Sequence, residues 1–62
     1  PTVLNAANEA AVALFLKGAI SFLQIDDLVE RALNGHVTIQ RPDLGTIHEI
    51  DRNTRKLVDS WV

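Results

Sequence analysis

The segment from Leu4 to Gly18 contains seven consecutive apolar residues, Ala10 to Leu16, in a stretch that favours helix throughout. Alanine is abundant and no β-branched cluster interrupts the segment, which predicts a helix over residues 2–17. A helix on the surface of a small free-standing domain has one apolar stripe and one polar face that is exposed to solvent. The second half of this helix has almost no polar face. Either the segment is not a surface helix, or it normally packs against something outside this chain.

Helical spacing predicts a core stripe on this helix, made of Leu4, Ala7, Ala11, Leu14 and Phe15. Other apolar residues lie on other sides of the helix, so that apolar surface wraps much of its circumference: Val3, Ala6, Ala10, Ala13 and Leu16. Thr2 is a candidate N-cap. Lys17 and Gly18 supply a cationic last turn and a glycine just past the helix end.

A second helix is predicted over residues 22–34, with Ser21 and Gln24 spaced as a capping box. Ile20 and Ile25 occupy the positions of a hydrophobic staple. The helix has one apolar face, formed by Phe22, Ile25, Leu28, Val29, Ala32 and Leu33. Asp27 and Arg31 have the spacing of an i,i+4 ion pair, and Gly35 is expected to end the helix.

The remainder of the chain predicts an extended connector followed by two short helices, over residues 43–50 and 52–61. The connector, residues 35–42, contains His36, Val37, Ile39 and Pro42. Asp51 is the expected N-cap of the last helix, and Arg55 and Asp59 the expected i,i+4 pair on it. Its apolar face comprises Thr54, Leu57, Val58 and Trp61. The prediction is an all-α fold: a single helical domain over residues 1–62, built as a small bundle of three to four short helices.

The length and composition of the chain limit the classes of function that it can have. A chain of 62 residues has a thin stability margin, and without cysteine it has no disulfide to widen it. A net charge of −2 with no basic stripe argues against a nucleic-acid partner. The longest apolar run is too short to span a bilayer, and no signal peptide can be read at Pro1. Because the chain has no methionine, we expect a piece of a longer protein.

No set of residues in the sequence has the pattern of a catalytic, cofactor-binding or metal-binding site. Ser21 is explained as a cap and Ser60 as a surface residue, with no histidine and acid placed beside either. His36 and His48 belong to no ligand-spaced cluster. Trp61 is expected to close a small core, the alternative being an interface anchor.

Asn5, Asn8 and Glu9 share one face of the first two helical turns, next to the surplus apolar surface. One interpretation is a solvated, N-terminal polar patch favoured by the helix dipole. The other is a hydrogen-bonding ledge against another domain. Under the second, the predicted interdomain contact consists of Asn5, Asn8, Glu9, Val12 and Leu16.

The first 25 residues resemble the C-terminal helical domain of 1-deoxy-D-xylulose 5-phosphate reductoisomerase. The family's P-x-x-L-N-A-A-N-E run is matched by Pro1, Leu4, Asn5, Ala6, Ala7, Asn8 and Glu9. A Phe-Leu pair and an I-x-F-x-x-I step follow, at Phe15, Leu16, Ile20, Phe22 and Ile25. Asp51 and Arg55 are similar to the D-x-x-x-R of the family's last helix.

The resemblance implies a parent enzyme that converts 1-deoxy-D-xylulose 5-phosphate to 2-C-methyl-D-erythritol 4-phosphate, on the non-mevalonate route to isoprenoids. It implies NADPH and a divalent metal, Mg or Mn, held by the two preceding domains, so that no cofactor or metal residue maps onto this chain. It also implies a bacterial cytoplasmic protein, or a plastid one in a plant or alga. This domain would pack on and stabilise the remaining domains of the enzyme, with no nucleic acid or membrane as partner.

Two other functions remain open on the sequence. The chain could be an independent helical protein-interaction or dimerisation module, since its surplus apolar surface could equally meet a separate partner or a second copy. A very small enzyme is the third, although no site residues converge. Alone in solution, an enzyme domain or an independent module could dimerise or swap helices to cover that surface.

Overall fold

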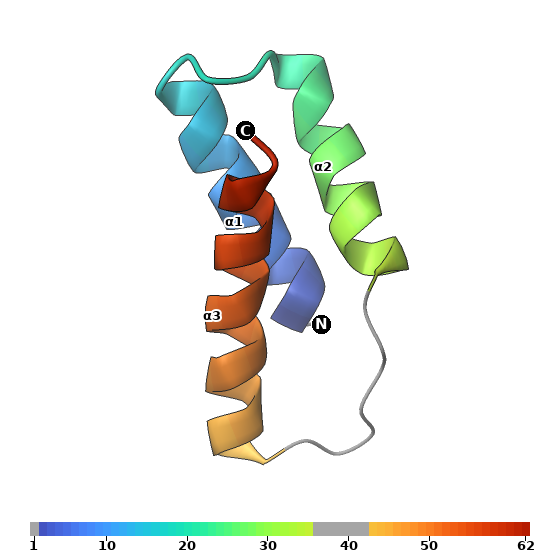
Figure 1. Ribbon diagram of the computed structural model, residues 1–62, viewed down its shortest axis with the longest axis vertical. Helices are drawn as coiled ribbons and strands as arrows, with labels where there is room; N and C mark the ends of the chain where they lie inside the picture. The colour runs from blue at the N-terminus through green and yellow to red at the C-terminus, as the bar shows by residue number, and fades with distance from the viewer. Residues whose placement is uncertain (1, 36–42) are drawn as a thin grey trace.

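The computed structural model describes residues 2–35 and 43–62, which form three helices (Figure 1). They are α1 (Thr2–Leu16), α2 (Phe22–Asn34) and α3 (Leu44–Ser60). The predicted all-α bundle is confirmed for these residues. Pro1 and residues 36–42 of the predicted connector, with His36, Val37, Ile39 and Pro42, lie outside the described residues.

The first helix is the central element of the bundle. α1 and α2 run antiparallel, joined by a short turn, and α3 lies alongside α1 (Figure 1). α1 packs extensively against both other helices, whereas α2 and α3 meet each other in only a few places. The fold therefore depends on how α1 divides its surface between two neighbours.

The start of α2 and the end of α1 form as local sequence signals predict. The Ser21 N–H donates to Gln24 Oε1 at 2.7 Å while the Gln24 N–H donates to Ser21 Oγ, which confirms the capping box. Past the end of α1, Gly18 has φ +79°, and the N–H groups of Gly18 and Ala19 donate to the carbonyls of Phe15 and Leu14. This is a Schellman motif, in which a glycine takes the left-handed conformation without a Cβ penalty.

The last helix is continuous, so the prediction of separate helices over 43–50 and 52–61 was wrong. α3 begins after Asp43, whose Oδ1 accepts from the Thr46 N–H at 2.7 Å, and runs to Ser60. Asp51 lies in its interior and is not a cap: its carboxylate accepts a hydrogen bond from Arg55 one turn later. An i,i+4 ion pair of this kind stabilises a helix that continues through both residues. No glycine or proline stands near Asp51 to interrupt the helix.

The buried face of α1 is rotated from the predicted stripe. Leu4 and Phe15 were expected in the core, but they are 40% and 37% exposed. The residues of α1 that are buried are Val3, Ala6, Ala7, Ala10, Ala11 and Leu14. α1 lies between two helices, and its alanine-rich side lets both approach closely, which a face of leucine and phenylalanine would prevent.

The core is thin and made mainly of small side chains. Its cluster consists of Val3, Ala7, Ala10, Leu14, Ala32 and Val58. Among the described residues, Val58 is the only large side chain with no residual exposure. Trp61, at the C-cap of α3, packs half-buried against the cluster, as expected of a residue that closes a small core. Burial of so little apolar volume gives the bundle little stability of its own.

Candidate functional site

The five residues predicted to contact another domain lie together on the side of α1 that is turned away from the core. Their spacing is i, i+3, i+4, i+7 and i+11, which places Asn5, Asn8, Glu9, Val12 and Leu16 along one helix face. Val12 is half-buried and the other four are exposed. Leu16 keeps 77% of its surface exposed. This face is therefore available for contact with another surface.

Glu9 has an intramolecular partner that the sequence did not indicate. Its Oε2 accepts from Arg55 Nη2 at 2.7 Å, and Asp51 Oδ1 accepts from Arg55 Nε at 2.6 Å. One guanidinium thus joins α1 to α3. The predicted Arg55–Asp59 pair was wrong, because the ion pairs that Arg55 forms in the described residues are with Asp51 and Glu9. No local pattern could reveal a pair 46 residues apart.

The two asparagines differ from Glu9. Within residues 2–35 and 43–62, neither the Asn5 nor the Asn8 side chain forms a hydrogen bond with another residue. Both amides carry two donors and an acceptor that remain open to an external partner. The face thus combines amide groups that have no partner in the described residues with exposed apolar surface. At its edge, Glu9 forms an ion pair with Arg55 of α3.

The ion pairs of Arg55 shift the pKa values of Asp51 and of Arg55 itself. The hydrogen bond from Arg55 is the main cause that lowers the pKa of Asp51 below its usual value of 3.8. The two carboxylates in turn raise the pKa of Arg55, first through Asp51 and then through Glu9. At the start of α3, the Thr46 backbone N–H lowers the pKa of the Asp43 carboxyl. All three groups are charged at neutral pH, in the form that the hydrogen bonds favour.

These shifts predict that the chain loses stability in acid. Because the pKa values of Asp43 and Asp51 are lower when folded than when unfolded, their contribution is complete above the unfolded value. It is lost as the pH falls through the folded value. We expect the melting temperature of the chain, followed by circular dichroism, to fall between about pH 5 and about pH 2. Asp51→Asn should flatten this dependence more than Asp59→Asn, because the Arg55 side chain donates hydrogen bonds to the Asp51 carboxylate; an equal effect of both would contradict the assignment.

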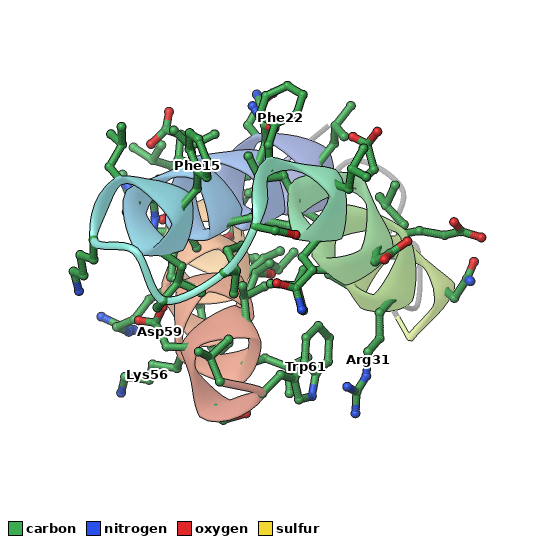
Figure 2. The ribbon with its side chains drawn as sticks, turned by 90° about the horizontal axis from the view of Figure 1, so that it is seen from above. Phe15, Phe22, Arg31, Lys56, Asp59 and Trp61 are labelled. Carbon is green, nitrogen blue, oxygen red and sulfur yellow. The ribbon has the colours of Figure 1, made fainter. Side chains whose placement is uncertain are left out.

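A second long-range contact closes the opposite side of the bundle. The Arg31 guanidinium stands 4.1 Å from the centroid of the Trp61 ring, which joins α2 to the end of α3 (Figure 2). A cation above an indole face is attracted by the ring quadrupole. The predicted Asp27–Arg31 pair was wrong, because no ion pair between them occurs in the described part of the chain and Arg31 turns to Trp61 instead.

Nothing in the described residues assembles into a catalytic or metal centre. No group of three His, Cys, Asp or Glu side chains among residues 2–35 and 43–62 could hold a metal ion. The Ser60 hydroxyl donates to the Leu57 carbonyl and Ser21 serves as a cap. A shallow pocket of about 120 Å³ carries no ionisable side chain and is lined by Val3, Ala32, Gly35, Asn53, Thr54 and Leu57. Nor is any helix of this part of the chain long and apolar enough to cross a membrane.

The distribution of apolar side chains by size is the most informative property of the surface. Alanines fill much of the interior, while nine large apolar residues are exposed: Leu4, Phe15, Leu16, Phe22, Leu23, Leu33, Leu44, Leu57 and Val62. Single exposed apolar residues are normal on a soluble domain, but contiguous ones mark a contact surface. In this domain, most large apolar side chains therefore lie outside the core cluster.

Comparison with known proteins gives a consistent result. The family model described as the DXP reductoisomerase C-terminal domain matches residues 1–57. The chain is similar to 1-deoxy-D-xylulose 5-phosphate reductoisomerase of Bacillus pumilus (strain SAFR-032), 58% identical over 60 residues, which are 97% of this chain and 16% of that protein. The enzyme of the same name from Bacillus subtilis (strain 168) is 55% identical over 60 residues, again 97% of this chain and 16% of that protein. That of Listeria monocytogenes serovar 1/2a (strain ATCC BAA-679 / EGD-e) is 57% identical over 94% of this chain and 15% of that protein.

The chain spans about one sixth of the length of these curated relatives. No solved structure matches it significantly.

Proposed function

Because the chain belongs to the family of DXP reductoisomerase C-terminal domains, we propose that it is the non-catalytic helical domain of a full-length reductoisomerase. The proposed enzyme converts 1-deoxy-D-xylulose 5-phosphate to 2-C-methyl-D-erythritol 4-phosphate in isoprenoid biosynthesis, in the cytoplasm of a bacterium. The relatives that carry the reductoisomerase name and align over nearly the whole chain support this proposal.

The described residues of this chain do not fit the cofactor or the metal of the proposed reaction. No three potential metal ligands converge among residues 2–35 and 43–62, and the shallow pocket has no cationic side chain for the phosphates of a dinucleotide. We therefore assign NADPH and the divalent metal to the part of the enzyme outside this chain. No step of the reaction is attributed to residues 1–62.

The role we propose for the chain is mechanical: a single helical domain that packs on the other domains of the enzyme and stabilises them. The observation that carries this role is the exposure of large apolar residues around a core of alanines. The proposed contact face is the outward side of α1, with Asn5, Asn8, Glu9, Val12 and Leu16. Covering Leu16 would remove apolar surface from water, and the open amides of Asn5 and Asn8 would find partners.

A pair of variants of the full-length enzyme tests this role. Leu16→Ser is expected to lower the melting temperature by several degrees and to reduce activity, because a buried leucine contributes about 2 kcal/mol. Leu44→Ser is the matched control: Leu44 is 69% exposed but lies at the start of α3, away from the proposed face. Activity is read from NADPH consumption with 1-deoxy-D-xylulose 5-phosphate. Equal melting temperatures for the two variants would rule out this contact face.

A further inference from the structure

A second apolar surface, which shares only Asn8 with the proposed contact face, follows the outer side of the α1–α2 pair. It comprises one stripe from each helix, and we name it the α1–α2 seam. The stripes are Leu4, Asn8, Ala11 and Phe15 on α1, and Phe22, Asp26, Val29 and Leu33 on α2. Both have the spacing i, i+4, i+7 and i+11, which keeps a helical stripe on one face over three turns.

The two stripes are in register. The rings of Phe15 and Phe22 meet edge to face, with centroids 5.7 Å apart. Leu4 and Leu33 each stand eleven residues from this aromatic pair, measured along antiparallel helices. The Phe15–Phe22 pair therefore stands at one end of the seam, and each stripe carries a leucine at its other end. Smaller or polar residues lie between the two ends.

The four large side chains of the seam are exposed in this structure, whereas Ala11 between them is buried. Phe22 is 70% exposed and the other three large side chains of the seam about 40%. Phe15 and Phe22 lie on the side of α1 and α2 away from α3, so α3 does not cover them (Figure 2). Four large apolar residues aligned along two helices present ridges against which a further helix can pack lengthwise. A surface of this length differs from scattered apolar residues, which need no partner.

The charges beside the seam indicate what kind of segment fits it. Asp26 and Glu30 lie one turn apart along the α2 side, and both are exposed. In the described residues neither forms an ion pair. The α1 side is neutral at Asn8 and Val12, and the seam itself contains no lysine or arginine. An occupant with basic residues along one edge would complement this surface, because opposite charges at the rim of a contact fix its register.

We propose that an amphipathic segment of the same polypeptide packs lengthwise along the α1–α2 seam, its apolar residues on the four large side chains and its basic residues facing Asp26 and Glu30. This inference rests on the proposed function, which places about five sixths of the enzyme outside this chain. A second copy of the chain fits less well. It would present the same seam, which has no basic side chain for the acidic rim.

Cysteine labelling of the full-length enzyme tests whether the seam is covered. The chain has no native cysteine, so Phe22→Cys and Leu33→Cys each introduce one thiol here, located after alkylation by mass spectrometry. Leu44→Cys is the reference, because Leu44 and Phe22 have nearly equal exposed fractions, 69% and 70%. We expect alkylation at positions 22 and 33 to be at least about tenfold slower than at position 44, because it then requires local opening. Equal rates at the three positions would overturn the inference.

Photo-crosslinking identifies the occupant. Phe22→benzoylphenylalanine keeps an aromatic side chain in the seam, and irradiation of the full-length enzyme should link position 22 to a segment of the same polypeptide outside residues 1–62. The product then migrates as a single chain on a denaturing gel. A product of doubled mass would assign the seam to a second copy and overturn the inference. An enzyme that turns over 1-deoxy-D-xylulose 5-phosphate while its seam remains freely labelled would defeat this inference alone, whereas loss of the proposed function would appear as absence of that turnover.

Discussion

Ala7→Leu is expected to lower the melting temperature of the isolated chain by roughly 10–20 °C. Ala7 has no exposed surface and lies in the core cluster on the face with which α1 meets its neighbours. A leucine there adds three carbons where the helices are in close contact, and overpacking of this kind costs about 1–3 kcal/mol. A domain of this size has only about 3–9 kcal/mol in total. The loss is large because the packing of α1 against two helices depends on small side chains.

The measurement is thermal unfolding of the chain followed by circular dichroism at the helix band. Ala13→Leu is the matched control, since Ala13 is an exposed residue of the same helix and alanine and leucine have similar helix propensities. The control should melt within a few degrees of the unchanged chain. Similar melting temperatures for the two variants would show that the alanine face of α1 is not closely packed.

Val58→Ala is expected to have the second-largest effect. Val58 is the one large side chain among the described residues with no exposure, and it carries the contribution of α3 to the core cluster. Removal of two carbons from a closed site costs the transfer free energy and leaves a cavity, together about 2 kcal/mol. In a domain of 60–100 residues, this corresponds to a fall of roughly 10 °C in melting temperature.

Val62→Ala provides the same chemical change at a position that is 57% exposed. It should alter the melting temperature little, because most of that side chain remains in water. If Val62→Ala destabilised the chain as much as Val58→Ala, the assignment of Val58 to the centre of the core would be wrong. The comparison also measures how far the stability of α3 depends on this one contact.

Both predictions follow from an uneven use of apolar residues in this domain. Mainly small residues hold the helices together, while large ones are exposed, five of them on the outward side of α1 and along the α1–α2 seam: Leu4, Phe15, Leu16, Phe22 and Leu33. A free-standing domain of this length would be expected to bury its largest side chains, since these contribute most per residue. A domain that functions within a larger enzyme can leave them for contacts with the rest of the polypeptide. The thin core and the exposed leucines and phenylalanines are thus two results of one arrangement.

The sequence by itself determined the parts of this protein that depend on neighbours a few residues away. The Ser21–Gln24 capping box, the glycine that ends α1 and the Asp43 start of α3 each involve groups within one helical turn, so the pattern alone was sufficient. The surplus of apolar surface on the first helix is likewise a property of the sequence, because it follows from the residue types at helical spacing. The family followed from the motif at Asn5 to Glu9 and its neighbours, confirmed by the family match.

Only the tertiary structure decided which residues meet across the bundle. Leu4 and Phe15 have the periodicity of a core stripe, but the two helices that pack on α1 select the alanine face beside it, because closer approach buries more of all three helices. Arg31 and Arg55 each have a suitable acid one turn away along the chain. Arg31 turns to Trp61 instead, and Arg55 keeps Asp51 but takes Glu9 as its second partner. Local pairs at exposed positions contribute only a few tenths of a kcal/mol, so the packing of distant elements is sufficient to override them.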